Sequence, residues 1–150
     1  MPVIPPSNNI LDKYAPLKAI NQFPHIKTHQ SQDLISVWEA WEKETGLQCP
    51  VPFWAHVWPA SLVLISWLQQ QNYCKNKRVI DIGCGAGAVA IAAAQLGARE
   101  VTANDIDPIA LHIARKNSDV NNIRLNYSNH DLSENADLII LSADTVFICD

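Results

Sequence analysis

Three kinds of pattern are absent from this sequence, and each absence excludes a class of protein. No apolar run reaches the roughly 20 residues that a transmembrane helix needs. The four cysteines form no CxxC pair and the five histidines add no close ligand spacing, so no metal site is expected. Basic residues do not dominate, because 11 Lys and Arg stand against 15 Asp and Glu; this balance argues against a general nucleic-acid binder.

The N-terminal region carries no targeting pattern. Its Met-Pro start is followed by polar residues and further prolines, without the basic and apolar blocks of a secretory signal. We therefore expect a soluble, cytoplasmic protein whose cysteines are free thiols. With 150 residues, 48% of them hydrophobic, the chain is large enough for one domain with a substantial core.

The first half of the chain predicts an irregular segment and then two helices. Residues 1–30 are rich in Pro and Asn and are expected to wrap the surface without regular structure. Ser31 suits the cap of a helix that ends at Gly46. A Pro/Trp-rich segment, CPVPFWAHVWPAS, follows, and Pro59 suits the first turn of a strongly apolar helix that continues to about Gln71.

The second half alternates short apolar strands with helices. Expected strands are residues 78–82, 100–104, 123–128 and 137–141; expected helices are residues 88–96 and 107–118. Such alternation is typical of a parallel sheet with helices on both faces. The predicted fold is therefore a Rossmann-like α/β fold.

A glycine-rich turn, Asp81-Ile-Gly83-Cys-Gly85-Ala-Gly87, connects the first of these strands to a helix. Glycines allow the backbone to approach a ligand closely, and the next helix points its N-terminus at that ligand. The turn alone is a weak signal. However, Asp105 follows the second strand about twenty residues later, where an acid meets ribose hydroxyls in nucleotide-binding folds. Together these features predict a nucleoside cofactor.

The spacing of the turn favours one kind of nucleoside. Dinucleotide sites use G-x-G-x-x-G, with a pyrophosphate held at the helix N-terminus, whereas this turn reads G-x-G-x-G. The carboxylate of Asp81 before the first glycine would repel a pyrophosphate. It suits S-adenosylmethionine, which carries a sulfonium and an ammonium but no phosphate.

The stretch VIDIGCGAGAVAIAAAQLGAREVTANDIDPIALHIARKN resembles class I methyltransferases. Together with PFWAHVWPAS, it is similar to the electron-transfer-flavoprotein β-subunit lysine methyltransferases and their bacterial relatives, over residues 31–150. The resemblance implies a partial S-adenosylmethionine-binding domain there. It also implies methyl transfer to a protein lysine, with the flavoprotein β subunit as one candidate substrate. The charge balance and the lack of a long apolar run predict neither nucleic acid nor membrane as partner.

The resemblance also assigns roles to individual residues. Around the methionine part of the cofactor it places Asp81, Gly83, Gly85 and Gly87. Around the nucleoside it places Asp105 on the ribose, Ile106 on the adenine and Asp131 at the adenine amino group, with Trp54 and Trp58 closing the pocket. Asp144 would be the catalytic acid beside the acceptor nitrogen. Read as residues alone, Trp54 and Trp58 equally suit core packing, Asp107 a helix cap, Asp131 a turn, His56 a structural hydrogen bond, and Trp38, Trp41 and Trp67 the core.

The C-terminal part departs from the family. It reads ADTVFICD where relatives have an acid–aromatic pattern such as GDxFYD, and the NPPY signature of adenine and glutamine methyltransferases is absent. The family sheet has seven strands, so we expect a short form without the last strands. Its fourth strand, residues 137–141, would then be an apolar edge that promotes self-association. A cofactor-binding chain without turnover is the alternative function, and a nicotinamide-dependent oxidoreductase is disfavoured by the glycine spacing.

Overall fold

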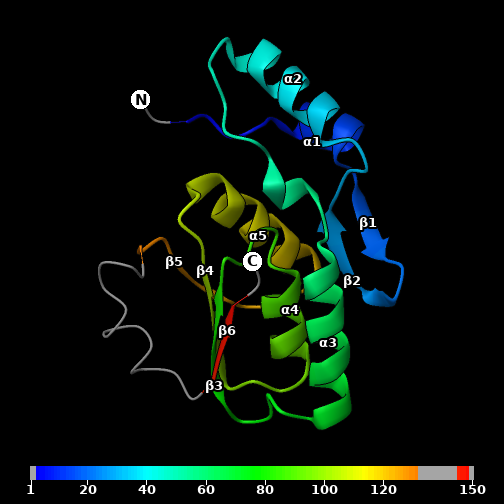
Figure 1. The fold of residues 1–150 in the computed structure, drawn as a ribbon, viewed down its shortest axis with the longest axis vertical. Coiled ribbons are helices and arrows are strands. Elements are labelled where there is room, and N and C mark those ends of the chain that lie inside the picture. Colours follow the sequence, from blue (N-terminus) through cyan, green and yellow to red (C-terminus); the bar gives the residue numbers. More distant parts are fainter. Residues whose placement is uncertain (1–2, 132–144, 149–150) are drawn as a thin grey trace.

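The computed structural model describes residues 3–131 and 145–148. Its centre is a parallel sheet with the strand order β5-β4-β3-β6 (Figure 1). The strands are β3 (Arg78–Ile82), β4 (Glu100–Asn104), β5 (Asn126–Ser128) and β6 (Thr145–Ile148). The predicted Rossmann-like α/β fold is confirmed, and the first two strands have the predicted bounds.

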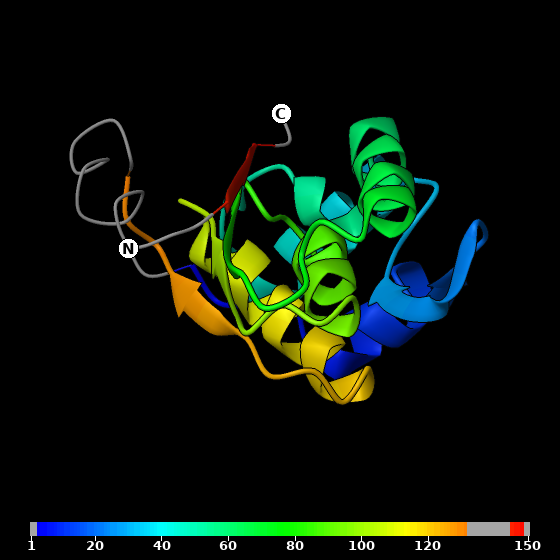
Figure 2. The ribbon, with the colours of Figure 1, turned by 90° about the horizontal axis from the view of Figure 1, so that it is seen from below.

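Two helices connect the central strands. These are α4 (Ala88–Gln95), between β3 and β4, and α5 (Pro108–Val120), between β4 and β5. Both crossovers run across the sheet in the same direction, and right-handed connections then place both helices on the same face. Figure 2 shows α4 and α5 together on that face, and α3 (Pro59–Gln71) packs beside α4. Helices on the opposite face, which the sequence also predicts, do not occur in the described part of the chain.

Helix α4 is short, and its residues Ala88–Ala93 are all buried. A helix that is apolar on every side must be covered on every side. The sheet, α3 and β2 (Phe23–His29) provide this cover, and the alanines allow their backbones to come close. The turn that precedes α4 is therefore held from several directions.

The N-terminal region differs from the expected irregular segment. It contains α1 (Asn8–Tyr14) and an antiparallel hairpin of β1 (Leu17–Ile20) and β2. Ser7 caps α1 by accepting a hydrogen bond from the backbone N–H of Ile10. The polar and proline residues that suggested irregular structure lie at this cap and along the strands, where only some positions, such as Ile26, are buried.

The helices after the hairpin largely follow the sequence. Helix α2 spans Leu34–Thr45 and ends in a left-handed Gly46 as predicted, but its cap is Asp33 rather than Ser31. A short 3-10 turn, η1 (Phe53–Ala55), precedes α3, which starts at Pro59 as predicted. Trp67 was expected in the core. It is instead 42% exposed, because it faces outward from α3 against Tyr73.

The strands at the two ends of the sheet match the sequence less well. The third strand was expected from residue 123, but β5 is shorter, and Ile123 packs against the core just before it. The fourth strand was expected at residues 137–141, which lie outside the described residues. On the side of β3 away from β4, the neighbouring strand is β6, later in the chain. No described helix is both long and apolar enough to cross a bilayer.

Two hydrophobic clusters lie side by side in the molecule. One joins the sheet, α3, α4 and the hairpin. The other joins α1, α2, η1 and α5, and it includes Trp41, Trp54 and Ala86. Cys49, Cys74 and Cys84 are free and buried in these clusters. Ala86 belongs to the glycine-rich turn, so that turn lies where the two clusters meet.

Candidate functional site

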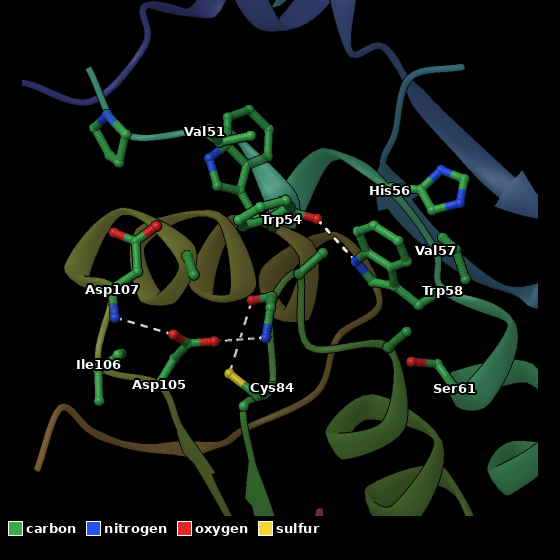
Figure 3. A pocket seen from close by; sticks show the side chains of 17 residues that line it. Val51, Trp54, His56, Val57, Trp58, Ser61, Cys84, Asp105, Ile106 and Asp107 are labelled. Carbon is green, nitrogen blue, oxygen red and sulfur yellow. Dashed lines mark hydrogen bonds between the residues drawn. The ribbon is translucent and has the colours of Figure 1, made fainter. Parts of the chain in front are cut away.

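A cavity of about 570 Å³ opens beyond the carboxyl ends of β3 and β4. Ligands of open α/β sheets bind at this edge, and the volume is typical of small-molecule sites. The turn after β3 forms its floor, and the segment around η1 forms its opposite wall (Figure 3). From the turn it is lined by Gly83, Cys84, Gly85 and Ala86; from the η1 segment by Val51, Phe53, Trp54, His56, Val57 and Trp58; and beyond β4 by Asp105, Ile106 and Asp107.

The turn is tightly bent and tied to β4. Gly83 and Gly85 have φ angles of 68° and 50°, in the left-handed region that glycine adopts at low cost. The N–H of Cys84 donates to the carbonyl of Asn104 over 3.0 Å, which joins the turn to the end of β4. A Cβ on Gly85 would meet no atom within 4 Å. This position therefore leaves open space above the turn.

Asp105 holds the floor of the cavity together. Its Oδ2 accepts the N–H of Gly85 over 2.8 Å, and its Oδ1 accepts the N–H of Asp107 over 2.9 Å (Figure 3). Each carboxylate oxygen has two lone-pair positions, so each keeps one for a further donor. Two adjacent oxygens with free acceptor positions suit a pair of neighbouring hydroxyl groups.

Asp107 and Ile106 continue the wall beyond Asp105. Asp107 caps α5, as one reading of the sequence predicted, because its Oδ1 accepts the N–H of Ile109 over 2.8 Å. Partial burial raises the pKa of Asp107, although its hydrogen bond to Ile109 opposes the shift. Ile106 is 71% exposed and lines the cavity, so its apolar side chain is available to a flat ligand group.

The aromatic residues of the opposite wall have two different roles. Trp54 is buried and packs edge-to-face on Trp41 at 6.4 Å between ring centroids, yet it also lines the cavity. Core packing and pocket lining are therefore not exclusive for this residue. Trp58 is more exposed, and its indole N–H donates to the carbonyl of Phe53 over 3.2 Å. The ring of His56 lies against Trp58 at 4.8 Å.

Asp81 does not line the described cavity. It is buried behind the turn, where its Oδ2 accepts the N–H of Ala90 over 3.0 Å. This bond caps the first turn of α4 from a distance. Its Oδ1 has no hydrogen-bond partner among the described residues. Burial raises the pKa of Asp81 to about 7; the bond to Ala90 opposes this, and the charge of Asp105 adds to it.

Three other predicted site residues lie elsewhere. Gly87 is packed against α5, where an added Cβ would come within 3.1 Å of the Cβ of Ala114. Asp131 is exposed and is not among the residues that line the cavity. Asp144 lies outside the described residues. The described cavity thus brings together Gly83, Gly85, Asp105 and Ile106 with Trp54 and Trp58.

The charge of the cavity has one sign. It contains the carboxylates of Asp105 and Asp107, and none of its described lining residues is Lys or Arg. Burial also raises the pKa of the Cys84 thiol far above its ordinary range, so that side chain stays neutral. Such a lining attracts a cationic ligand and offers no described Lys or Arg side chain to pair with a phosphate.

The sequence did not single out several residues of the apolar wall. Val51, Phe53 and Val57 belong to the same Pro/Trp-rich segment as Trp54 and Trp58. The composition of the whole segment could have identified these residues. It is an apolar stretch between two helices, and it forms no long helix or strand of its own. Cys84 and Ala86 entered the lining because they lie between the glycines of the turn.

The parallel sheet, the glycine turn and the acid after β4 define the fold of class I S-adenosylmethionine-dependent methyltransferases. The model of one such family, "Ribosomal protein L11 methyltransferase (PrmA)", matches residues 58–147. The chain belongs to this family.

Individual relatives agree with this assignment. The ribosomal protein L11 methyltransferase of Polynucleobacter necessarius is 44% identical over 69 residues, which are 46% of this chain and 21% of that protein. The electron transfer flavoprotein beta subunit lysine methyltransferase of Danio rerio is 44% identical over 75 residues, which are 49% of this chain and 29% of that protein. The similarity to these relatives therefore spans less than a third of their length.

A solved structure shows the same fold. The 16S rRNA N2 G1207 methyltransferase RsmC of T. thermophilus, in complex with AdoMet and guanosine, superposes with a TM-score of 0.53 at 25% identity. The superposition covers 63% of this chain and 26% of that one. The predicted fold class and family resemblance are thus confirmed.

Proposed function

We propose that this chain forms the S-adenosylmethionine-binding part of an enzyme that methylates a protein. One observation carries the proposal. The carboxylate of Asp105 accepts a hydrogen bond from the N–H of Gly85 at the floor of the cavity. None of the described residues that line this cavity is Lys or Arg. This arrangement selects a nucleoside that carries positive charge instead of phosphate.

The residues present fit this cofactor. Asp105 keeps acceptor positions for the two ribose hydroxyls, and the open space above Gly85 accommodates a chain beside the turn. Ile106 and the apolar wall around Trp54 suit the adenine. Asp81, Gly83, Gly87 and Asp131 complete the proposed set, with Asp81 and Gly87 acting by holding the turn and α4 in place.

When bound, the cofactor supplies a methyl group on its sulfonium. The chain itself has to orient that group toward the acceptor and to exclude water from it. Asp105 would hold the ribose of the cofactor. The apolar side chains of Trp54 and Val51 on the opposite wall would exclude water from the cavity. In this proposal the charged end of the ligand would lie above the glycine turn.

The acceptor is proposed to be a protein side chain, and specifically a lysine amine. Support comes from the names of relatives, which include methyltransferases of ribosomal protein L11 and of the flavoprotein β subunit. An ordinary lysine has a pKa of about 10.4, so it must lose a proton before it can accept a methyl group. Asp144 is proposed to orient the amine and take part in that step.

Methyl transfer into proteins tests this function. We expect the chain to incorporate radiolabelled methyl from S-adenosylmethionine into a protein of a cell lysate with little turnover, at a lysine identified by mass spectrometry. Asp105→Ala serves as the inactive control. Binding of S-adenosylhomocysteine without any incorporation would instead support a cofactor-binding chain without turnover, and incorporation at another residue type would reject lysine as the acceptor.

A further inference from the structure

Asn117 connects the glycine turn to the N-terminal hairpin. This residue lies on α5 and is fully buried. Its Nδ2 donates to the carbonyl of Ala86 over 2.9 Å, and its Oδ1 accepts the N–H of His29 over 2.9 Å. The side-chain amide of Asn117 therefore makes one hydrogen bond to the turn at the floor of the cavity and another to β2.

The hairpin end of this connection is itself anchored. The ring of His29 is buried, and its Nδ1 donates to the carbonyl of Ala15, the residue that ends α1, over 2.9 Å. Both α1 and β2 precede residue 58, where the match to the family model begins. Asn117 thus joins a part of the chain outside that match to the cavity.

A second asparagine provides a natural comparison. Asn121 is the residue that caps the C-terminus of α5, one turn after Asn117, and it also bonds to β2. Its Oδ1 accepts the N–H of Lys27 over 2.9 Å, and its Nδ2 donates to the carbonyl of Lys27 over 2.6 Å. Neither Asn121 nor Lys27 is among the residues that line the cavity. Both asparagines therefore form hydrogen bonds to β2, and Asn117 also forms one to the glycine turn.

We propose that Asn117 is a positioning residue for the cofactor turn and makes strand β2 a supporting part of the binding site. The proposal rests on the proposed function for the identity of the ligand. The carbonyl of Ala86 shares a planar peptide group with the N–H of Gly87, so its bond to Asn117 helps to keep that N–H on the carbonyl of Cys84. The N–H of Gly85, in the same turn, donates to Asp105. A buried carbonyl without its donor would favour a rotated turn.

The turn can be tested without any ligand. Hydrogen exchange of the Gly85 and Gly87 amides in the free protein should be about tenfold faster in Asn117→Ala than in the wild type, as expected for loss of a buried hydrogen bond. In Asn121→Ala these amides should exchange at the wild-type rate, although thermal stability falls. Equal exchange in the two variants would overturn the proposal whether or not S-adenosylhomocysteine binds.

The ligand-linked test uses the wild type, so it does not depend on whether a variant folds. Saturation with S-adenosylhomocysteine should slow exchange of the His29 amide, which donates to Asn117, and leave the Lys27 amide, which donates to Asn121, unchanged. An unchanged His29 amide in the saturated protein would contradict the coupling. Absence of binding by calorimetry would contradict the proposed function instead, and the exchange rates of the free variants would still decide the role of Asn117.

Discussion

At Asp105, structure and proposed binding use the same carboxylate. Its oxygens hold the N–H groups of Gly85 and Asp107, so the side chain is fixed before a ligand arrives. A fixed acceptor loses little freedom on binding, which strengthens each hydrogen bond that it makes to a ligand.

Asp105→Ala should weaken binding of S-adenosylhomocysteine by about 10- to 100-fold, since a charge-assisted hydrogen bond contributes roughly 1.5–3 kcal/mol. Isothermal calorimetry on the folded variant measures this change. Asp105→Asn, which keeps one acceptor oxygen, should lose less affinity. Wild-type affinity in the alanine variant would remove Asp105 from the site.

Gly85 is predicted to tolerate no side chain. Its φ of 50° is especially unfavourable for a β-branched residue such as valine, and a Cβ there would point into the open space of the cavity. Gly85→Val should abolish binding and leave helical circular dichroism mostly intact. Gly87→Val is the matched comparison, because it meets Ala114 and should lower stability first. Normal binding by the Gly85 variant would show that the turn is only structural.

Which residues face the cavity was only partly predictable. Spacing identified the turn and the acid after β4, because parallel strands bring their carboxyl ends together. It did not separate Gly85, which borders the cavity, from Gly87, which contacts α5. It also did not show that the side chain of Asp81 turns away to α4. These differences depend on the path of the backbone through the turn, which tertiary packing decides.

At the scale of elements, α4 depends on a buried acid. The pKa of Asp81 is raised to about 7 in the folded protein, against about 3.9 in an unfolded chain. Between these values the folded state keeps a proton that the unfolded state has lost. The free energy of unfolding should therefore fall as the pH rises from about 4 to about 7.

Asp81→Asn tests this dependence, since asparagine cannot ionise and still offers an oxygen to the N–H of Ala90. Urea unfolding at intervals between about pH 4 and pH 8 should show a flatter dependence in the variant, by up to about 4 kcal/mol across the window. The same slope in both proteins would show that Asp81 is not the titrating group.

Helix α2 offers a prediction away from the cavity. Asp33 accepts the N–H of Ser36, and the hydroxyl of Ser36 is the main cause that lowers the pKa of Asp33. Asp33→Ala should lower the free energy of unfolding, measured by urea titration, because α2 loses the side-chain cap at its N-terminus. Affinity for S-adenosylhomocysteine should not change, and a large loss of affinity would contradict the separation of α2 from the site.

The predictability of elements followed the strength of their periodic pattern. β3 and β4 were identified closely because short apolar runs flank the glycine turn and its helix, and α3 because it is strongly apolar and has Pro59 in its first turn. The hairpin was missed because its strands contain exposed polar positions and a proline, and its pairing is a tertiary event. Self-association through residues 137–141 stays a prediction, because these residues lie outside the described chain.

At the scale of the molecule, two hydrophobic clusters meet at the glycine turn. The hairpin belongs to one, and α1 and α2 belong to the other. Asn117 bonds to Ala86 of the second cluster and to His29 on the hairpin. The proposed binding site is therefore supported by residues on both sides of residue 58, where the family match begins.

Calorimetric titration of the chain with S-adenosylhomocysteine and, separately, with NAD tests the central claim most directly. The Asp105 and Asp107 carboxylates and the lack of Lys or Arg in the described lining predict one S-adenosylhomocysteine per chain. They also predict binding of NAD at least about a hundredfold weaker, a difference of about 2.7 kcal/mol. NAD binding as tight as that of S-adenosylhomocysteine would contradict the account.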